Sequence, residues 1–321
     1  MIEIERPFVP ARRHPVYTGD YNIQTSSIDK LLGEVTNWID SRNPGGIIYG
    51  RARIGKTRAI HILSKQLKKI YGSDLPIFNV LICEHKSSEK YLYLEMLKDI
   101  GHTLAKSNRH PTDLKTNLVN HLISEGKSSS LGQVIIFIDE AGFMSIDDFN
   151  YLIDIYNRLE RAHVQLTAIL VGTSELISLK KTLMQLNKQQ IVERFMVREY
   201  NFRGIQSVKD LQVCLAEYDY TEYPENSGWS FTKYFYPEAV SDGKKLNTLA
   251  EDLFLCFTEA IGTRIVEIPM QYATSTVENC FRRFGCDGIN VYFPSREEWM
   301  QAIKDSGYVM AENLFEGCKA I

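Results

Sequence analysis

The sequence predicts an α/β fold in which helices cover a parallel β-sheet. Two continuous apolar runs, Val134–Ile138 and Leu166–Val171, are typical of strands buried on both faces of a parallel sheet. Helical patterns alternate with such runs up to about Phe202, as they do in βαβ units. A glycine-framed loop, Gly50–Thr57, joins a third apolar run to a helix. Beyond Phe202 the pattern becomes helical, which indicates a second region of different character.

The spacing of apolar residues sets the expected elements. Before Phe202, we expect helices at Ser27–Ile39, Lys56–Ile70, Glu89–Ile100, Leu114–Ile123 and Ile146–Leu159, and strands at Gly46–Tyr49, Ile77–Cys83, Val134–Ile138 and Leu166–Val171, with a fifth strand after Phe195. Later helices are expected at Val208–Tyr218, Leu246–Ile261 and about Ile265–Phe281. Pro269 marks a kink or a later start of the last of these.

The predicted organisation has three parts. Residues 1–24 form an irregular N-terminal extension, residues 25–203 form the α/β domain, and residues 204–321 form a helical region. The helical region contains an aromatic, turn-rich insertion, residues 218–243, and ends in a C-terminal tail.

Composition excludes several classes of protein. The net charge of −3 argues against a chain that coats nucleic acid indiscriminately, but leaves room for a local basic stripe. The six cysteines lack CxxC or His spacings suited to zinc, and Cys83, Cys214 and Cys256 lie in apolar segments that favour buried, reduced thiols. The sequence shows neither a signal peptide nor an apolar stretch long enough to span a membrane, so we expect a cytoplasmic protein.

The segment Gly50-Arg-Ala-Arg-Ile-Gly-Lys-Thr57 matches the phosphate-loop pattern GxxxxGK[ST] between a strand and a helix. Its backbone N–H groups can surround phosphate oxygens, and the following helix offers its positive N-terminus. Lys56 would reach the terminal phosphates, and the Thr57 hydroxyl would bind Mg²⁺. The predicted contact set for ATP is Gly50, Arg51, Ala52, Arg53, Ile54, Gly55, Lys56, Thr57 and Arg58.

Acidic residues follow the first long apolar run. Asp139 and Glu140 stand at the carboxyl end of that predicted strand, where ligands of α/β sheets bind. We expect Asp139 to hold Mg²⁺ and Glu140 to orient and polarise an attacking water. An adjacent Asp-Glu pair is also common on surfaces, and its position after a buried strand favours the catalytic interpretation.

The second long run ends in Gly172-Thr173-Ser174. Thr173 fits a residue that contacts the terminal phosphate or the attacking water. Ser174 fits a cap of the helix that begins near Glu175.

Together, these motifs resemble those of AAA+ ATPases over roughly residues 25–285. The resemblance implies a five-stranded sheet of order 5-1-4-3-2, a small helical lid, and rings or filaments with ATP at subunit junctions. Arg194 matches the arginine finger that reaches a neighbour's nucleotide, and Arg264 matches the second sensor, which contacts phosphate in cis. Arginine suits both tasks because it is always charged and planar.

Softer features resemble the transposition regulators TnsC and TniB, relatives of MuB. These are the stretch Val171–Leu176, the Gly262-Thr263-Arg264 sequence before an apolar helix, and Phe231–Pro237. The resemblance implies an ATP-dependent protein that polymerises on double-stranded DNA. Its partners would be a transposase and a target-selection protein or CRISPR-guided complex.

Contacts with DNA would be few per subunit and directed to the backbone. The candidates are Lys86, Lys90, Lys106, Asn108 and Arg109, with Lys180-Lys181 and Arg282-Arg283 as weaker ones. Solvated surface lysines are an equally good interpretation of each. Arg12-Arg13-His14 either approaches the nucleotide or a neighbour, or lies in a disordered tail. The aromatic residues Trp229, Phe231, Tyr234, Phe235 and Tyr236 favour a lid core over a base-stacking platform.

Two other functions fit the same motifs. A helicase loader of the DnaC type would prefer single-stranded DNA. A signalling or defence ATPase would use the nucleotide as a latch, without stimulation of turnover by DNA.

Overall fold

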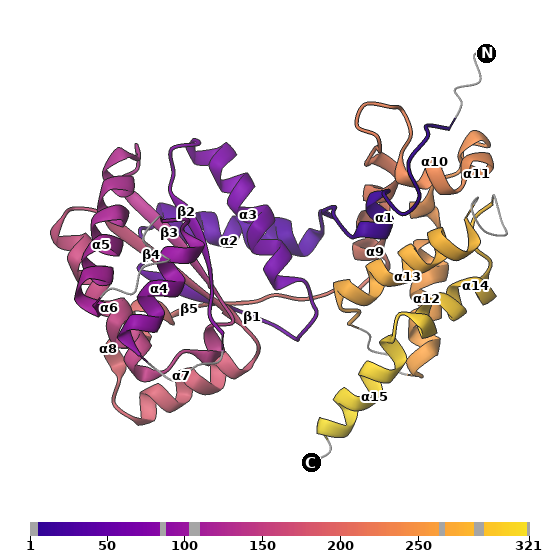
Figure 1. Ribbon diagram of the computed structural model, residues 1–321. Helices are drawn as coiled ribbons and strands as arrows, with labels where there is room; N and C mark the ends of the chain where they lie inside the picture. Colours follow the sequence, from indigo (N-terminus) through magenta and orange to yellow (C-terminus); the bar gives the residue numbers. More distant parts are fainter. Residues whose placement is uncertain (1–5, 84–87, 103–109, 263–266, 286–291, 320–321) are drawn as a thin grey trace. The chain divides into compact units, whose positions relative to one another are not determined.

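The computed structural model describes residues 6–83, 88–102, 110–262, 267–285 and 292–319, the last five of these by their backbone alone (Figure 1). Contacts divide the chain into two compact units. The α/β unit consists of Ile28–Ala52 and Lys56–Phe202. The helical unit consists of the chain before Ile28, the loop residues Arg53–Gly55, and the chain from Arg203 onward.

The α/β unit is built on a five-stranded parallel sheet. Its strands are β1 (Gly45–Tyr49), β2 (Ile77–Leu81), β3 (Gln133–Asp139), β4 (Gln165–Gly172) and β5 (Arg198–Asn201). The order across the sheet is β2-β3-β4-β1-β5, and every neighbouring pair is parallel. This confirms the predicted fold class and the order 5-1-4-3-2. The central strands β3 and β4 are buried along almost their whole length, as their continuous apolar sequences require.

Helices cover both faces of this sheet. They are α2 (Ser26–Asp40), α3 (Lys56–Tyr71), α4 (Glu89–Asp99), α5 (Pro111–Ser128), α6 (Ile146–Arg161), α7 (Glu175–Gln185) and α8 (Gln189–Phe195). One core joins Val134, Ile136 and Ile138 to apolar residues of α4–α8. The alternate residues Ile135 and Phe137 are equally buried on the other face. Trp38 of α2 lies against Gly46 of β1, and the crossover from β1 to β2 carries α3. Right-handed crossovers require this division, because only the β1-to-β2 connection runs toward the β2 edge.

One strand ends earlier than its apolar pattern predicts. The expected strand Ile77–Cys83 ends at Leu81. Cys83 is exposed, so the prediction of a buried thiol is wrong there, whereas Cys214 and Cys256 are buried. In the described part of the chain, no helix has the length and hydrophobicity needed to cross a bilayer.

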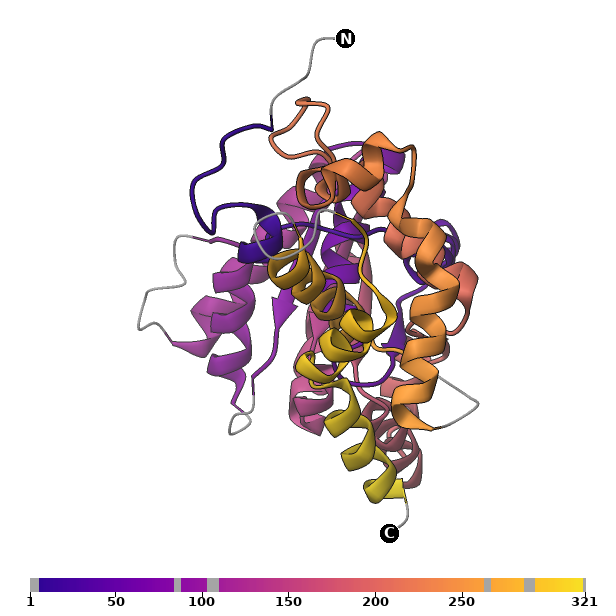
Figure 2. The same cartoon turned by 90° about the vertical axis from the view of Figure 1, so that its right-hand side faces the viewer.

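The helical unit consists of helices joined by loops (Figure 2), and its apolar side chains form a second core. Its elements are α1 (Pro15–Thr18), α9 (Val208–Tyr220), α10 (Phe231–Phe235), α11 (Pro237–Ser241), the 3₁₀ turn η3 (Leu246–Leu249), α12 (Ala250–Ile261), α13 (Met270–Phe284), α14 (Arg296–Asp305) and α15 (Tyr308–Lys319). All five aromatic residues predicted for the lid core are buried: Trp229, Phe231, Tyr234, Phe235 and Tyr236. This confirms the packing interpretation over a base-stacking surface.

Helix α13 begins later than its apolar spacing predicts, which confirms the later start that Pro269 indicated and not a kink. Pro269 occupies its N-cap position with extended backbone, so the helix starts at Met270 and not at Ile265. Just before it, Ile268 pairs with Ile205 in an antiparallel bridge. This pairing keeps the backbone extended up to the proline, which is why helical spacing alone misplaces the start.

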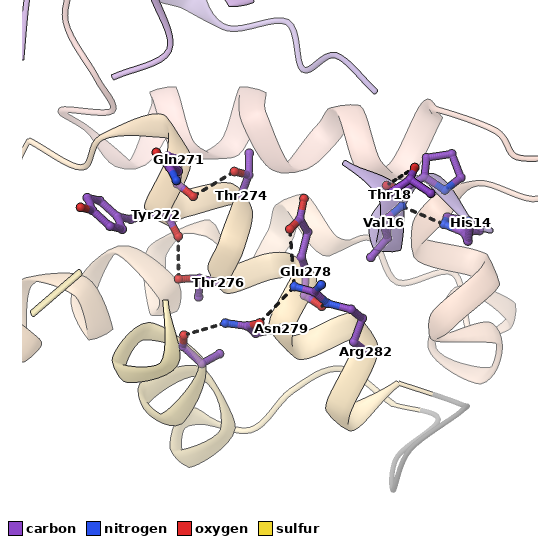
Figure 3. A network of polar contacts seen from close by, with 12 residues as sticks. His14, Val16, Thr18, Gln271, Tyr272, Thr274, Thr276, Glu278, Asn279 and Arg282 are labelled. Atoms are coloured by element: carbon purple, nitrogen blue, oxygen red, sulfur yellow. Dashed lines mark hydrogen bonds and ion pairs between the residues drawn. The ribbon is translucent and has the colours of Figure 1, made fainter. Parts of the chain in front are cut away.

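The N-terminal segment is part of the helical core (Figure 3). His14 caps α1 by accepting a hydrogen bond from the backbone N–H of Val16 at 3.2 Å, and its ring lies among Phe231 and other aromatic rings. Further along, the Tyr21 hydroxyl donates to Glu278 of α13 at 2.7 Å. The disordered-tail interpretation is therefore wrong for His14. Approach of Arg12 and Arg13 to a nucleotide or neighbour stays a prediction.

Candidate functional site

Three central strands bring the predicted site residues to one edge of the sheet. Tyr49 of β1 pairs with Gly172 of β4, and the N–H of Gly50 donates to the Gly172 carbonyl at 3.3 Å. Ile138 of β3 pairs with Leu170 of β4, so Asp139 ends its strand beside the same edge. Because all three strands are parallel, their carboxyl ends gather the phosphate loop, the acidic pair and Thr173.

The loop backbone follows a path that few residues adopt. Arg53 (φ 62°) and Gly55 (φ 101°) both lie in the left-handed region. For Gly55 this conformation requires glycine, because a side chain would be strained there. Alternation of left- and right-handed residues turns successive N–H groups toward one side and forms an anion-binding concavity. The helix α3 begins immediately afterwards, at Lys56.

The Lys56 side chain makes hydrogen bonds to the backbone at the start of the same loop. Its Nζ donates to the carbonyl oxygens of Gly50 at 3.1 Å and Arg51 at 2.9 Å, and the residue is only 7% exposed. Burial lowers the pKa of Lys56, and the carboxylates of Glu140 and Asp139 partly oppose this by raising it. A bound phosphate would place a further negative charge beside this buried ammonium and would stabilise its charged form.

Thr57 and Asp139 are in direct contact. The Thr57 hydroxyl donates to Oδ2 of the Asp139 carboxylate at 2.6 Å, across a sequence separation of 82 residues. A hydroxyl and a carboxylate are oxygen donors that suit Mg²⁺, which usually takes only one or two protein ligands beside phosphates and water. Among the described residues, no group of three or more His, Cys, Asp or Glu side chains is arranged to hold a metal. The oxygens of Thr57 and Asp139 fit Mg²⁺ bound together with a nucleotide.

Glu140 has an unusual backbone conformation. Its φ of 53° is left-handed, which is uncommon for any residue other than glycine, and its N–H donates to Oδ1 of Asp139 at 3.0 Å. Strained residues of this kind gather at functional sites, where neighbouring structure holds them in place.

The capping of α7 differs from the prediction. Ser174 occupies the N-cap position, but its side chain makes no capping hydrogen bond. The Thr173 hydroxyl accepts one from the N–H of Glu175, at a long 3.4 Å. The cap prediction is therefore wrong for Ser174, and the phosphate-sensing role of Thr173 stays a prediction. Both hydroxyls follow one strand end, so sequence alone does not separate their roles.

Arg194 lies at the end of α8 and is held by α6. Its Nη1 donates to Oδ1 of Asn157 at 2.8 Å, and its guanidinium stands 5.1 Å from the ring centre of Tyr156. Sequence reasoning missed both partners because they lie 37 and 38 residues away and no motif marks them. Arg264 falls outside the described residues, so its assignment stays a prediction.

The predicted DNA contacts are only partly visible. Lys86, Lys106, Asn108 and Arg109 fall outside the described residues, and Lys90 lies half-buried in the first turn of α4. The weaker candidates make ion pairs: Lys180 with Glu199, Arg282 with Glu278 and Arg283 with Asp305. These pairs favour the ordinary surface interpretation of those three residues.

Comparisons with known proteins agree with this geometry. Residues 39–179 match a family model described as an AAA domain, and no curated protein matches the chain. The ORC2 protein of Aeropyrum pernix in its ADP form is 12% identical, with a TM-score of 0.57 over 94% of this chain and 71% of that one. The ORC1 protein of the same organism in complex with DNA is 12% identical, with a TM-score of 0.53 over 91% and 68%.

A Walker-type ATPase of Pyrococcus abyssi is also similar, at 12% identity and a TM-score of 0.53 over 92% of this chain and 74% of that one. Likeness at such low identity speaks to the fold alone. Together with the AAA-domain match and the strand order β2-β3-β4-β1-β5, it identifies the fold of the α/β unit. The α/β unit has the fold of the AAA+ P-loop NTPases.

Proposed function

We propose that this protein binds ATP with Mg²⁺ and hydrolyses the ATP at the carboxyl edge of its sheet. The observation that carries the proposal is the 2.6 Å contact between Thr57 and Asp139 beside the buried ammonium of Lys56. In this assignment the loop N–H groups and Lys56 hold the phosphates, while Thr57 and Asp139 hold the metal ion. Mg²⁺ supplies charge neutralisation at the phosphates.

Glu140, Thr173 and Arg194 would each have a separate role in hydrolysis. Glu140 orients the attacking water and polarises it, since a carboxylate at a strand end can accept a proton there. Thr173 contacts the terminal phosphate or that water. Arg194, whose guanidinium is held by Asn157 of α6, acts on the nucleotide of a neighbouring copy, so the proposal implies an oligomer.

We further propose that the protein regulates DNA transposition, as the resemblance to TnsC and TniB implies. ATP would close the contacts between copies on double-stranded DNA, and hydrolysis would loosen them. Support for a DNA-related role comes from similar structures: an A. pernix ORC1 protein in complex with DNA, and a Drosophila ORC bound to DNA. A transposase and a target-selection protein or CRISPR-guided complex would be its partners.

Electron microscopy with linear duplex DNA tests this proposal. Wild-type protein should form rings or filaments on DNA with ATP or a non-hydrolysable analogue, and lose them with ADP. Lys56→Ala should form none under any condition, because it cannot bind nucleotide. Particles that stay single-copy with every nucleotide would contradict the proposal. A preference for single-stranded DNA would instead indicate a helicase loader.

Arg194→Ala separates assembly from nucleotide binding. The variant should bind ATP as a monomer with wild-type affinity, measured with a fluorescent ATP analogue, and should fail to assemble on DNA. Asn157→Leu removes the partner that orients the guanidinium and should give an intermediate defect. Normal polymers from Arg194→Ala would remove the finger assignment.

A further inference from the structure

The outer face of helix α3 carries a continuous row of basic side chains. Its sequence, KTRAIHILSKQLKKIY, contains five lysines and arginines and no acidic residue. Arg58, His61, Lys65, Lys68 and Lys69 are all exposed. At about 100° per residue they fall within an arc of roughly 100°, on one side of the helix. From Arg58 to Lys69 the row is about 16 Å long.

Helix stability explains only part of this row. Lys68 and Lys69 lie in the last turn, where cations favour the helix dipole. Arg58 lies in the first turn, where the dipole disfavours a cation, and that turn has no acidic residue. Among the residues that the structure describes, no ion pair involves Lys65, Lys68 or Lys69. The part of the row formed by Lys65, Lys68 and Lys69 is therefore not the charge-paired surface that soluble helices usually present.

Two carboxylates lie near the C-terminal end of α3. Asp40 of α2 accepts a hydrogen bond from Tyr71 at 2.6 Å. Asp74, just past the helix, accepts from the N–H of Ser130 at 2.7 Å. A hydrogen bond from a neutral donor leaves the charge of a carboxylate in place, so these acids offset the row only at this end, and α3 itself contains no acidic residue.

Neutral donors extend the row onto the edge strand β2. The Ser64 hydroxyl donates to the Ile60 carbonyl at 2.7 Å and lies 3.2 Å from Oδ1 of Asn79. Nδ2 of the same amide faces Nδ1 of His61, also at 3.2 Å. With Asn79 donating to Nδ1, the neutral imidazole carries its proton on Nε2. His61 then offers a further N–H donor within the row.

We infer that the outer face of α3 binds the phosphate backbone of double-stranded DNA. Consecutive phosphates of one strand rise 3.4 Å along the axis but also turn around it, so a straight row of about 16 Å faces only about two or three phosphates of that strand. Lysine and arginine side chains on a helix surface can contact these phosphates without reading sequence. This inference rests on the proposed DNA-binding function and names a contact surface separate from the predicted candidates near Lys86 and Lys106.

The test compares two double variants of the full chain. Lys65→Gln/Lys68→Gln removes two cations from the row. Lys127→Gln/Lys209→Gln removes two exposed lysines from α5 and α9, and Lys127, like Lys68, lies in the last turn of its helix. Binding to a fluorescent 30-base-pair duplex is measured against salt concentration, with a non-hydrolysable ATP analogue. Binding of the analogue itself is measured in parallel.

The α3 variant should bind DNA at least tenfold more weakly at 100 mM salt, and the slope of log K against log salt should fall by about 1.8. The control should match wild type, and all proteins should bind the nucleotide analogue equally. An α3 variant with wild-type affinity and slope overturns the inference while leaving DNA binding intact. Wild type that fails to bind duplex DNA overturns the proposed function itself. Loss of binding to anionic lipid vesicles without loss of DNA affinity would assign the row to membranes instead.

Discussion

At the scale of single residues, Lys56 combines burial with a positive charge. Because burial lowers its pKa, the folded protein holds this proton less firmly than the unfolded chain does. We expect Lys56→Met to abolish ATP binding and to raise the free energy of unfolding without nucleotide. The gain should be largest near pH 7 and should shrink as pH rises toward the ordinary lysine pKa of 10.5. Urea unfolding of both proteins at pH 7 and pH 10 measures it, and a gain that grows with pH would contradict the assignment.

Thr57 offers a second test at this scale, because its hydroxyl contacts Asp139 at 2.6 Å. Thr57→Val keeps the shape and removes the oxygen, whereas Thr57→Ser keeps the oxygen. We expect the valine variant to lose most of the Mg²⁺ dependence of ATP affinity and at least a hundredfold in turnover, and the serine variant to stay near wild type. Calorimetric titration of ATP with and without Mg²⁺ checks this. Equal Mg²⁺ dependence in both variants would mean that the hydroxyl is not a ligand.

The site residues differ in how far sequence could locate them. Lys56 and Thr57 belong to one contiguous motif, and Asp139 ends a continuous apolar strand. Local sequence patterns were therefore enough to predict that these three residues share a site. The hold of Asn157 on Arg194, and the choice of Thr173 over Ser174 as cap, depend on contacts or small rotations that no local pattern encodes. Sequence therefore predicted the participants better than their partners.

At the scale of elements, close packing between α2 and β1 positions the strand that leads into the phosphate loop. A Cβ at Gly46 would lie 2.6–2.9 Å from ring atoms of Trp38. Gly46→Ala should therefore displace the ring and destabilise the fold by about 1–3 kcal/mol, as overpacking usually does.

The control for this prediction lies on α2 itself. A Cβ at Gly33 would meet nothing within 4 Å, so Gly33→Ala should stabilise the protein by about 0.5–1 kcal/mol through helix propensity. Urea unfolding followed by circular dichroism measures both. Opposite signs are expected, and destabilisation by both substitutions would point to a general intolerance of the unit instead of the Trp38 contact.

Elements whose structure follows from their own local sequence were the easiest to predict. Strands β3 and β4 are continuous apolar runs, and α3 has a clear glycine-to-helix start. The start of α13 was misplaced because the bridge between Ile205 and Ile268 joins segments more than sixty residues apart. The N-terminal segment was misjudged for the same reason, since Tyr21 finds its partner in Glu278. Long-range pairing, not local propensity, decided both.

At the scale of the whole molecule, the proposed cycle depends on separating assembly from hydrolysis. In the proposed cycle, Arg194 would provide the contact between copies, whereas Glu140 would act within its own site. A variant that lacks the Glu140 carboxylate should still assemble through Arg194. Because such a variant retains ATP, it should also retain the assembled state. This reasoning makes Glu140 the position at which the cycle can be stopped after assembly.

Glu140→Gln is the substitution that stops it there. Glutamine has nearly the same size and can keep the left-handed backbone of Glu140, but it cannot accept a proton from water. We expect ATP to bind with wild-type affinity, turnover to fall at least a hundredfold, and polymers on duplex DNA to persist after free nucleotide is diluted. Light scattering after dilution follows the polymers, and phosphate release follows turnover. Glu125→Gln, at an exposed position of α5, is the matched control and should disassemble like wild type. Faster disassembly of the Glu140 variant would mean that hydrolysis maintains the assembly and does not release it.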